Sequence, residues 1–360
     1  MKKNLIAVAI AGVLAVPFAA QADIAFSGDA RARYNTKTPD GGDAAALTDS
    51  RVRLGFVAKD GDVASVHYRG YMSTGTHGDG EPAYATDWAF VKANLGPVTV
   101  SAGEMLANWG TKLLYWDVRP KRVMISGKAG GHWMGITFDK STETNNKDTD
   151  VPADGKPNPF TGNDADDKQA IKLLVKGKNY GLLHSMIEDG AGDKSSTVTD
   201  VYYMGAAGDI KYNVEFVTEG GDAEGTSLGA NMMMPMGGMT LSAALINFAD
   251  GGAGFDADYL DGMFMGCDAG NVCPSIGDSG DGAMTIAASL GMGFGDGMKG
   301  HLSFASVAGD GANEGTGIEL AVFKSLSKKT NVKAFFGTVS QDDDSNNTHT
   351  GMGAAINTKF

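Results

Sequence analysis

The sequence predicts an all-β protein, a transmembrane antiparallel β-barrel of about 18 strands, with about 16 as the alternative. Apolar and polar residues alternate in short segments along nearly the whole chain, a period of two that is typical of strands. An export signal begins the chain, and no later stretch approaches the ~20 consecutive apolar residues of a spanning helix. A closed barrel can also cross a bilayer, because all its backbone hydrogen bonds are made between strands.

Residues 1–22 read MKKNLIAVAIAGVLAVPFAAQA. Two lysines are followed by an apolar core and then by small residues, which is the arrangement of a secretory signal peptide. A membrane-anchoring helix is the alternative, but the apolar run is short for one. We expect the leader to be removed, so that residues 23–360 form the barrel.

The chain is acidic, with a formal net charge of -13. Nucleic acid is therefore not an expected partner. With 52 glycines and 20% charged residues, the composition fits neither disorder nor collagen. The histidines are scattered, and the chain shows no nucleophile elbow, phosphate loop or zinc spacing. The sequence thus predicts no enzyme, no cofactor and no metal site.

The first predicted strands carry apolar residues on one face and arginines on the other. In residues 23–35, Ile24 and Phe26 lie on the face opposite to the charged residues, and residues 49–58 and 65–72 alternate in the same way. Five arginines are therefore expected to share the inward face: Arg31, Arg33, Arg51, Arg53 and Arg69.

Neighbouring strands would place these like charges ~5 Å apart. Such repulsion is tolerable only where water, counterions or acids surround the charges. One interpretation is a transverse field at the narrowest point of a pore, which orients dipolar solutes as they cross. The other is that ion pairs with Asp29, Asp49 and Asp87 hold the barrel wall together. The two interpretations can coexist.

Tight turns and longer polar loops alternate along the chain, which is typical of transmembrane barrels, and two strands for each long loop give about 18. Tight turns are expected near residues 59–62, 96–97, 129–131, 178–179, 208–209, 237–238, 295–297 and 328–330. Long loops are expected near residues 36–48, 73–83, 107–120, 141–168, 188–197, 219–226, 250–282, 309–314 and 341–348. A soluble β-sandwich also alternates, but the strand number and the loop asymmetry favour the barrel.

Residues 104–122, EMLANWGTKLLYWDVRPKR, interrupt the alternation with aromatic and charged residues. We expect this third long loop to fold inward across the mouth of the barrel. Its apolar residues, such as Trp109, would pin the loop to the wall. The candidates for lining the narrowest part of the pore are the five arginines together with Asp87, Glu104, Lys112, Asp117 and Arg119.

Three further features can be interpreted from the sequence. Cys267 and Cys273 lie close together in a Gly/Asp-rich segment, which predicts a disulfide that closes a surface loop. The acidic segments 148–167 and 341–347 either bind divalent cations that bridge lipopolysaccharide phosphates or form a solvated surface. Aromatic girdles at the membrane interfaces are expected from Trp88, Phe90, Tyr202 and Tyr212.

Several segments resemble Gram-negative outer-membrane porins of the general-diffusion, trimeric type. Residues 86–105 resemble the strand pair before the inward third loop, and residues 122–141 resemble the pair that follows it. Residues 323–337, FKSLSKKTNVKAFFG, resemble the penultimate hairpin. The terminal Phe360 is similar to the family's barrel-assembly signal. In contrast, Asp87 stands where many members have arginine.

The resemblance implies a multi-pass barrel in the cell outer membrane, surrounded by lipid and lipopolysaccharide, and a homotrimer. It also implies that the C-terminal strand contacts the barrel-assembly machinery. The expected function is a water-filled channel for passive diffusion of small hydrophilic solutes and ions. The alternatives are a channel specific for a carboxylate, a sugar or a phosphate ester, and then a barrel enzyme or a structural surface protein.

Overall fold

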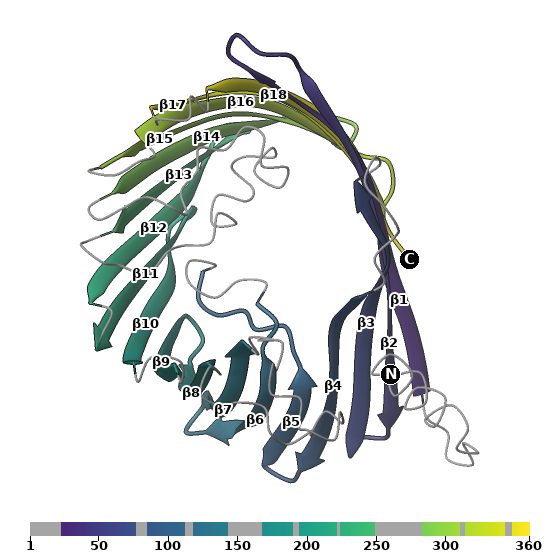
Figure 1. Ribbon diagram of the computed structural model, residues 1–360, viewed down its shortest axis with the longest axis vertical. Coiled ribbons are helices and arrows are strands. Elements are labelled where there is room, and N and C mark those ends of the chain that lie inside the picture. The colour runs from purple at the N-terminus through teal and green to yellow at the C-terminus, as the bar shows by residue number, and fades with distance from the viewer. Residues whose placement is uncertain are drawn as a thin grey trace, which may run out of the picture.

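A computed structural model describes residues 23–76, 85–111, 118–142, 168–189, 194–221, 224–248, 283–309, 314–342 and 348–360. Within these ranges, 18 antiparallel strands form a single sheet (Figure 1). Each strand pairs with its neighbours in the chain, and β1 pairs with β18 to close the barrel. The predicted fold class is confirmed, and the strand number is 18 rather than 16. Over the same residues, no helix is long and apolar enough to cross a membrane.

The first half of the barrel consists of β1 (Asp23–Pro39), β2 (Ala45–Asp60), β3 (Ala64–Thr76), β4 (Ala85–Leu95), β5 (Val98–Glu104), β6 (Lys121–Ala129), β7 (His132–Thr142), β8 (Lys168–Lys176) and β9 (Tyr180–Asp189). The second half consists of β10 (Lys194–Ala207), β11 (Ile210–Gly221), β12 (Gly225–Met236), β13 (Met239–Phe248), β14 (Met284–Gly295), β15 (Met298–Ala308), β16 (Glu314–Ser325), β17 (Thr330–Asp342) and β18 (His349–Lys359). The expected signal peptide lies outside the described residues.

Short turns join β2 to β3, β4 to β5 and each later pair up to β16 and β17, at the positions that the sequence predicts. The turn between β12 and β13 shows the reason, because Gly237 and Gly238 have φ values of 59° and 91°. A two-residue hairpin needs positive φ at both central positions, which glycine adopts without strain.

The loop predicted at residues 36–48 is shorter in the structure. β1 continues to Pro39 and β2 begins at Ala45, so the connection spans only residues 40–44. Thr36 and Lys37 pair with both β18 and β2. Their polar composition is typical of a loop, but the two neighbouring strands satisfy their backbone groups and extend the wall.

The outer face of the barrel is apolar and the inner face is polar. Leu320 and Phe336 point outward with 56% and 53% of their surface exposed, whereas the alternate positions include the buried Glu319. A continuous apolar exterior is stable against lipid hydrocarbon, and a closed barrel leaves no backbone group unpaired there. The chain is therefore built as a membrane-spanning barrel and not as a sandwich with a buried apolar core.

Four ladders among the described strands contain a register shift, and two of these shifts lie in β2 to β4 beside the inward arginines. In the β3–β4 ladder, Arg69 pairs with Trp88 and Gly70 pairs with Thr86, so Asp87 is an extra residue between them. Such a β-bulge re-aims the side chain of the extra residue. Asp87 and Trp88 therefore both face the interior although they are adjacent in the chain. A second shift, in the β2–β3 ladder, follows Val52.

The C-terminus completes the closure of the barrel. Gly28 donates its N–H to the carbonyl of Phe360 at 3.2 Å, and Phe360 donates back to the carbonyl of Gly28 at 3.0 Å. The phenyl ring of Phe360 lies over Gly28, where a Cβ would overlap it. The expected role of Phe360 in assembly is not tested by this geometry.

Candidate functional site

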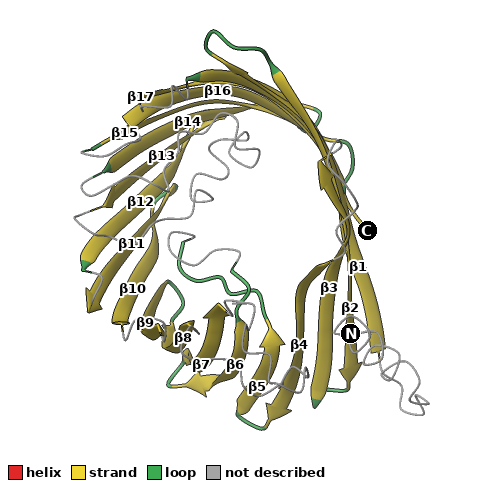
Figure 2. Ribbon diagram, in the orientation of Figure 1, coloured by secondary structure: helices red, strands yellow, loops and turns green. Residues whose placement is uncertain are grey.

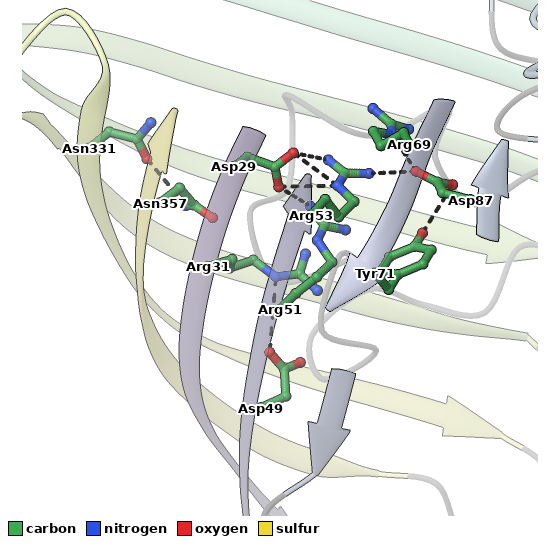
Figure 3. A network of polar contacts seen from close by, with 10 residues as sticks. All are labelled: Asp29, Arg31, Asp49, Arg51, Arg53, Arg69, Tyr71, Asp87, Asn331 and Asn357. Carbon is green, nitrogen blue, oxygen red and sulfur yellow. Dashed lines mark hydrogen bonds and ion pairs between the residues drawn. The ribbon is translucent and has the colours of Figure 1, made fainter. Parts of the chain in front are cut away.

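The centre of the interior site is the carboxylate of Asp87, whose side chain is fully buried. Arg69 and Arg119 each donate an Nε hydrogen bond to it. The guanidinium of Arg53 lies 3.6 Å away, and the hydroxyl of Tyr71 donates at 3.2 Å. Figure 3 shows Arg53, Arg69 and Tyr71 converging on this carboxylate. Because Arg119 belongs to the third loop, Asp87 ties the end of that loop to the wall.

The remaining arginines interleave with two other aspartates on β1 and β2. Arg31 lies directly opposite Arg51 in the ladder, an unfavourable pair of like charges. Asp29 compensates it on one side, 3.4 Å from Arg51 and 2.9 Å from Arg53. Asp49 compensates it on the other side, 3.9 Å from Arg31 and also hydrogen-bonded to Arg33. The same aspartates that the sequence indicated as wall partners are thus the observed ones.

The arginine network is defined as Arg31, Arg33, Arg51, Arg53, Arg69 and Arg119 with Asp29, Asp49 and Asp87. Its six guanidinium groups exceed its three carboxylates by three positive charges. The arginine side chains on β1 to β3 keep between 12% and 24% of their surface exposed. Water and solutes can therefore reach the network, and its field extends into the interior of the barrel.

Glu104 does not join this network. It pairs with Ala89 and Lys121 in the ladder, on the face that carries the exposed Val91 and Val123. The structure therefore places Glu104 on the outer face, contrary to the expectation that it lines the pore. The reason is that β5 continues through Glu104 and the third loop begins one residue later. Four other expected residues lie outside the described part of the chain: Lys112, Asp117, Cys267 and Cys273.

The third loop runs inside the barrel, as we predicted (Figure 2). Its residues 105–111 extend from the end of β5 to the inner face of β8 to β11. Trp109 is buried against Leu174, Leu183 and Tyr202, and its ring meets that of Tyr202 edge to face with centroids 5.6 Å apart. The expectation of Trp109 as a wall contact is confirmed. Tyr202, expected in an outer girdle, is instead 2% exposed beneath the loop.

The carboxylate of Glu215, on β11, binds Thr111 at the end of the segment 105–111. Glu215 accepts hydrogen bonds from the backbone N–H of Thr111 and, at 2.6 Å, from the Thr111 hydroxyl. Gly110 has a φ of 65°, and a Cβ there would overlap the Glu215 carboxylate. Alternation in the sequence indicates that Glu215 faces inward, but no local signal links it to a loop more than a hundred residues earlier.

A cavity of about 530 Å³ lies between the third loop and the short-turn rim. His67 stacks on Phe90 in this cavity, with ring centroids 4.4 Å apart, and the Arg69 guanidinium lies 5.1 Å from the centre of the Trp88 ring. Trp88 and Phe90 were expected in an outer girdle, and the bulge at Asp87 explains why they face inward instead. The lining residues are His67, Arg69, Trp88, Phe90, Lys92, Thr99, Ser101, Met105, Leu106, Met124, Ser126 and Trp133.

A second ion cluster extends the polar interior across β6 to β8. Arg122 donates two hydrogen bonds of 2.6 Å to the buried carboxylate of Asp139, and the ammonium of Lys172 lies 3.0 Å from the same group. Among the described residues, no three His, Cys, Asp or Glu side chains are grouped so that they could hold a metal ion.

Comparisons with known proteins show which solved structures share this architecture. No protein-family model matches the sequence, and a search of curated proteins found no match. Crystal structures of OccK2 (OpdF) from Pseudomonas aeruginosa align with a TM-score of 0.66 at 13% identity, over 94% of this chain and 98% of that chain. One of them contains glucuronate.

Two further solved structures are similar. OccK3 (OpdO) from the same organism gives a TM-score of 0.63 at 12% identity, over 94% of this chain and 96% of that chain. A BenF-like porin from Pseudomonas fluorescens Pf-5 gives 0.63 at 14% identity, over 94% and 98%. At this level of identity the likeness establishes the fold, so the chain has the porin fold that the sequence resemblance implied.

Replacement of Asp87 by Asn is expected to release the end of the third loop. Removal of one partner from a buried ion pair typically costs about 3 kcal/mol, and here three arginines lose their shared carboxylate. Limited trypsin digestion of the folded protein should then cleave faster within residues 105–120. Asp29→Asn is the matched control, because Asp29 contacts Arg51 and Arg53 but not the loop. Equal loop cleavage in both variants would contradict the role of Asp87.

Gly110→Ala is expected to displace the tip of the loop from Glu215. Overpacking of this kind costs about 1–3 kcal/mol, so amide hydrogen exchange in residues 105–111 should accelerate roughly tenfold. Gly130→Ala is the control, because Gly130 has a similar φ of 57° but its Cβ would meet its nearest atom at 3.9 Å. Unchanged exchange in Gly110→Ala would show that the contact with Glu215 does not hold the loop.

Proposed function

We propose that the protein is an outer-membrane channel through which small hydrophilic solutes and ions diffuse passively. The observation that carries the proposal is an accessible, charged network that binds the end of an inward-folded loop through Arg119, inside a closed barrel whose exterior is apolar. A polar interior and an apolar exterior separate water from lipid along the full length of the strands. Permeation needs no chemical step, so the residues act by size and charge alone.

The arginine network combines the two roles that the sequence left open. Its ion pairs hold β1, β2, β3 and the third loop together, which is a structural role. Its excess of three positive charges produces a field that favours anions at this point of the pathway. The chain as a whole is acidic, with a formal net charge of -13, so the network is a local exception and orients solutes where the loop approaches the wall.

A channel specific for carboxylate-bearing solutes is the second candidate. Two observations favour it: the accessible arginines, which are suited to bind carboxylates in a bidentate manner, and the OccK2 structure in complex with glucuronate. The two candidate functions differ in whether a solute saturates a binding site in the channel. A specific channel would be blocked by micromolar to millimolar glucuronate, whereas a general diffusion channel would conduct in its presence without block.

Export, assembly and oligomerisation remain proposals. We propose that residues 1–22 direct export and that the terminal Phe360, paired with Gly28 at the seam, contacts the barrel-assembly machinery. We also propose that the mature protein is a homotrimer in the outer membrane. Cross-linking of the protein in native membranes tests the trimer, because a monomer would yield no band at three times the chain mass.

Reconstitution into planar bilayers tests the function directly. Purified protein should produce discrete current steps whose size scales with the salt concentration, because ions would cross a water-filled pathway. Protein unfolded by heat before addition is the control and should produce no steps. Folded protein that inserts without conducting would overturn the channel proposal.

The triple replacement of Arg31, Arg33 and Arg51 by Ala should shift ion selectivity toward cations. The anion-to-cation permeability ratio should fall roughly two- to tenfold, at the lower end of focusing effects in charged clefts. The reversal potential in a salt gradient measures it. A matched control removes three exposed lysines near the short-turn rim, Lys178, Lys211 and Lys329, and so changes the net charge equally. Equal shifts of the reversal potential in both variants would mean that the network only stabilises the barrel wall and does not set ion selectivity.

A further inference from the structure

A row of three methionines crosses the outer face of the barrel on β12, β13 and β14. Met236 lies directly opposite Met239 in one ladder, and Met239 lies directly opposite Met292 in the next. The row is on the same face as the exposed Leu228 and Ile286, which belong to the apolar exterior. Figure 1 shows the three strands side by side. The three side chains therefore leave the wall in the same direction, from neighbouring positions.

The methionine row, defined as Met236, Met239 and Met292, lies at the short-turn rim. Met236 and Met239 flank the two-residue turn at Gly237 and Gly238. The three side chains are 43%, 38% and 37% exposed, so an ion can reach their thioether groups from outside the wall. Short turns are periplasmic in barrels of this type. The row is therefore at the periplasmic edge of the apolar exterior, where an ion can approach from water.

An apolar exterior alone does not explain why these positions hold methionine. Leu95 and Val98 flank the turn between β4 and β5 and pair with each other in the same way. Aliphatic side chains without sulfur thus fill the equivalent positions of another hairpin. The chain has 18 methionines, and eight of them lie on β12 to β15: Met232, Met233, Met234, Met236, Met239, Met284, Met292 and Met298.

An aromatic ring lies at one end of the methionine row. Met292 pairs with Gly300 in the β14–β15 ladder. The ring of Phe294 lies over Gly300, where a Cβ would be 2.7 Å from the nearest ring atom. The face of a phenyl ring attracts cations, and a thioether packs favourably beside such a ring. The row thus continues from three sulfur atoms to a π-system, and both favour a cation of low hydration.

We propose that the methionine row binds one monovalent copper ion, Cu⁺. Soft thioether ligands select Cu⁺, whereas hard cations such as Ca²⁺ and Mg²⁺ take oxygen ligands. Directly paired residues have Cβ atoms about 4.5–5.5 Å apart. Because the methionine side chain is flexible, the sulfur atoms of Met236 and Met292 can converge on an ion held by Met239. His, Cys, Asp and Glu side chains take no part in this site.

The chemistry of the ligands also predicts how binding depends on pH. Thiolate and imidazole ligands must lose a proton before they bind a metal ion. A thioether carries no proton to lose. The affinity of the methionine row for the ion should therefore stay constant between pH 5 and pH 8, a range over which histidine changes its charge.

The test uses the folded protein in detergent micelles, with isotope-labelled methionine methyl groups that are observed by NMR. Every sample carries Cys267→Ser and Cys273→Ser, so that thiols do not compete for the ion. Ag⁺ is the probe, because it has the charge and the sulfur preference of Cu⁺ and is stable in air. One equivalent of Ag⁺ should shift the three resonances of the methionine row, and Cu⁺ added without oxygen should shift the same three.

Two conservative variants separate the row from other exposed methionines. Met239→Leu removes the central thioether with little change in volume, so the Ag⁺ affinity reported by Met236 and Met292 should fall at least tenfold. Met352→Leu is the matched control. Met352 is 49% exposed on the outer face, but its ladder partners contain no sulfur, so its replacement should leave the affinity of the row unchanged.

Four results would overturn the proposal. The first is that one equivalent of Ag⁺ leaves the three resonances in place. The second is that Met352 shifts at the same Ag⁺ concentration as the row, because any exposed methionine would then bind the ion. The third is an unchanged affinity in Met239→Leu or, if that variant does not fold, in Met292→Leu. The fourth is an equal response to Ca²⁺.

The inferred site lies on the outer face of the barrel and is independent of conduction. Met239→Leu should therefore conduct as the parent protein does. A protein that conducts in bilayers but binds no Ag⁺ at the row would refute the copper site alone. A protein that binds Ag⁺ there but passes no current would refute the channel alone.

Discussion

The buried carboxylate of Asp87 is the contact on which the interior of the barrel depends. One acid accepts from Arg69 and Arg119 and lies beside Arg53. Without it, three guanidinium groups would face one another in a confined space, where their repulsion is weakly screened. A β-bulge places this side chain inward, so a local irregularity of the backbone determines where the arginine network and the third loop meet.

The third loop is held at two places by different kinds of contact. Arg119, near its end, is held by charge at the β4 wall, whereas Trp109 and Thr111 are held by packing and hydrogen bonds at β8 to β11. The described ends of the loop therefore contact two separate parts of the wall. Two anchors restrict these ends more than either would alone.

Much of this arrangement could be predicted from residue order. The strict period of two identified the inward arginines on β1 to β3, because each side chain alternates across a paired strand. The period of two gave the wrong face for a side chain where a ladder contains a bulge or where a strand extends further than expected. The bulge at Asp87 turned Trp88 and Phe90 inward, and the continuation of β5 through Glu104 turned that residue outward. Tyr202 was expected in an outer aromatic girdle, but it lies inside the barrel, where Trp109 of the third loop covers it.

By itself, the sequence determined the class of fold, the number of strands to within two, the positions of the turns and the inward direction of the third loop. These features depend on local periodicity and turn chemistry, which residues close together in the sequence determine. Only the tertiary structure decided that Asp87 gathers three arginines and that Glu215 holds Thr111. Such contacts join residues distant in the chain, and they depend on ladder register and closure, which no short segment encodes.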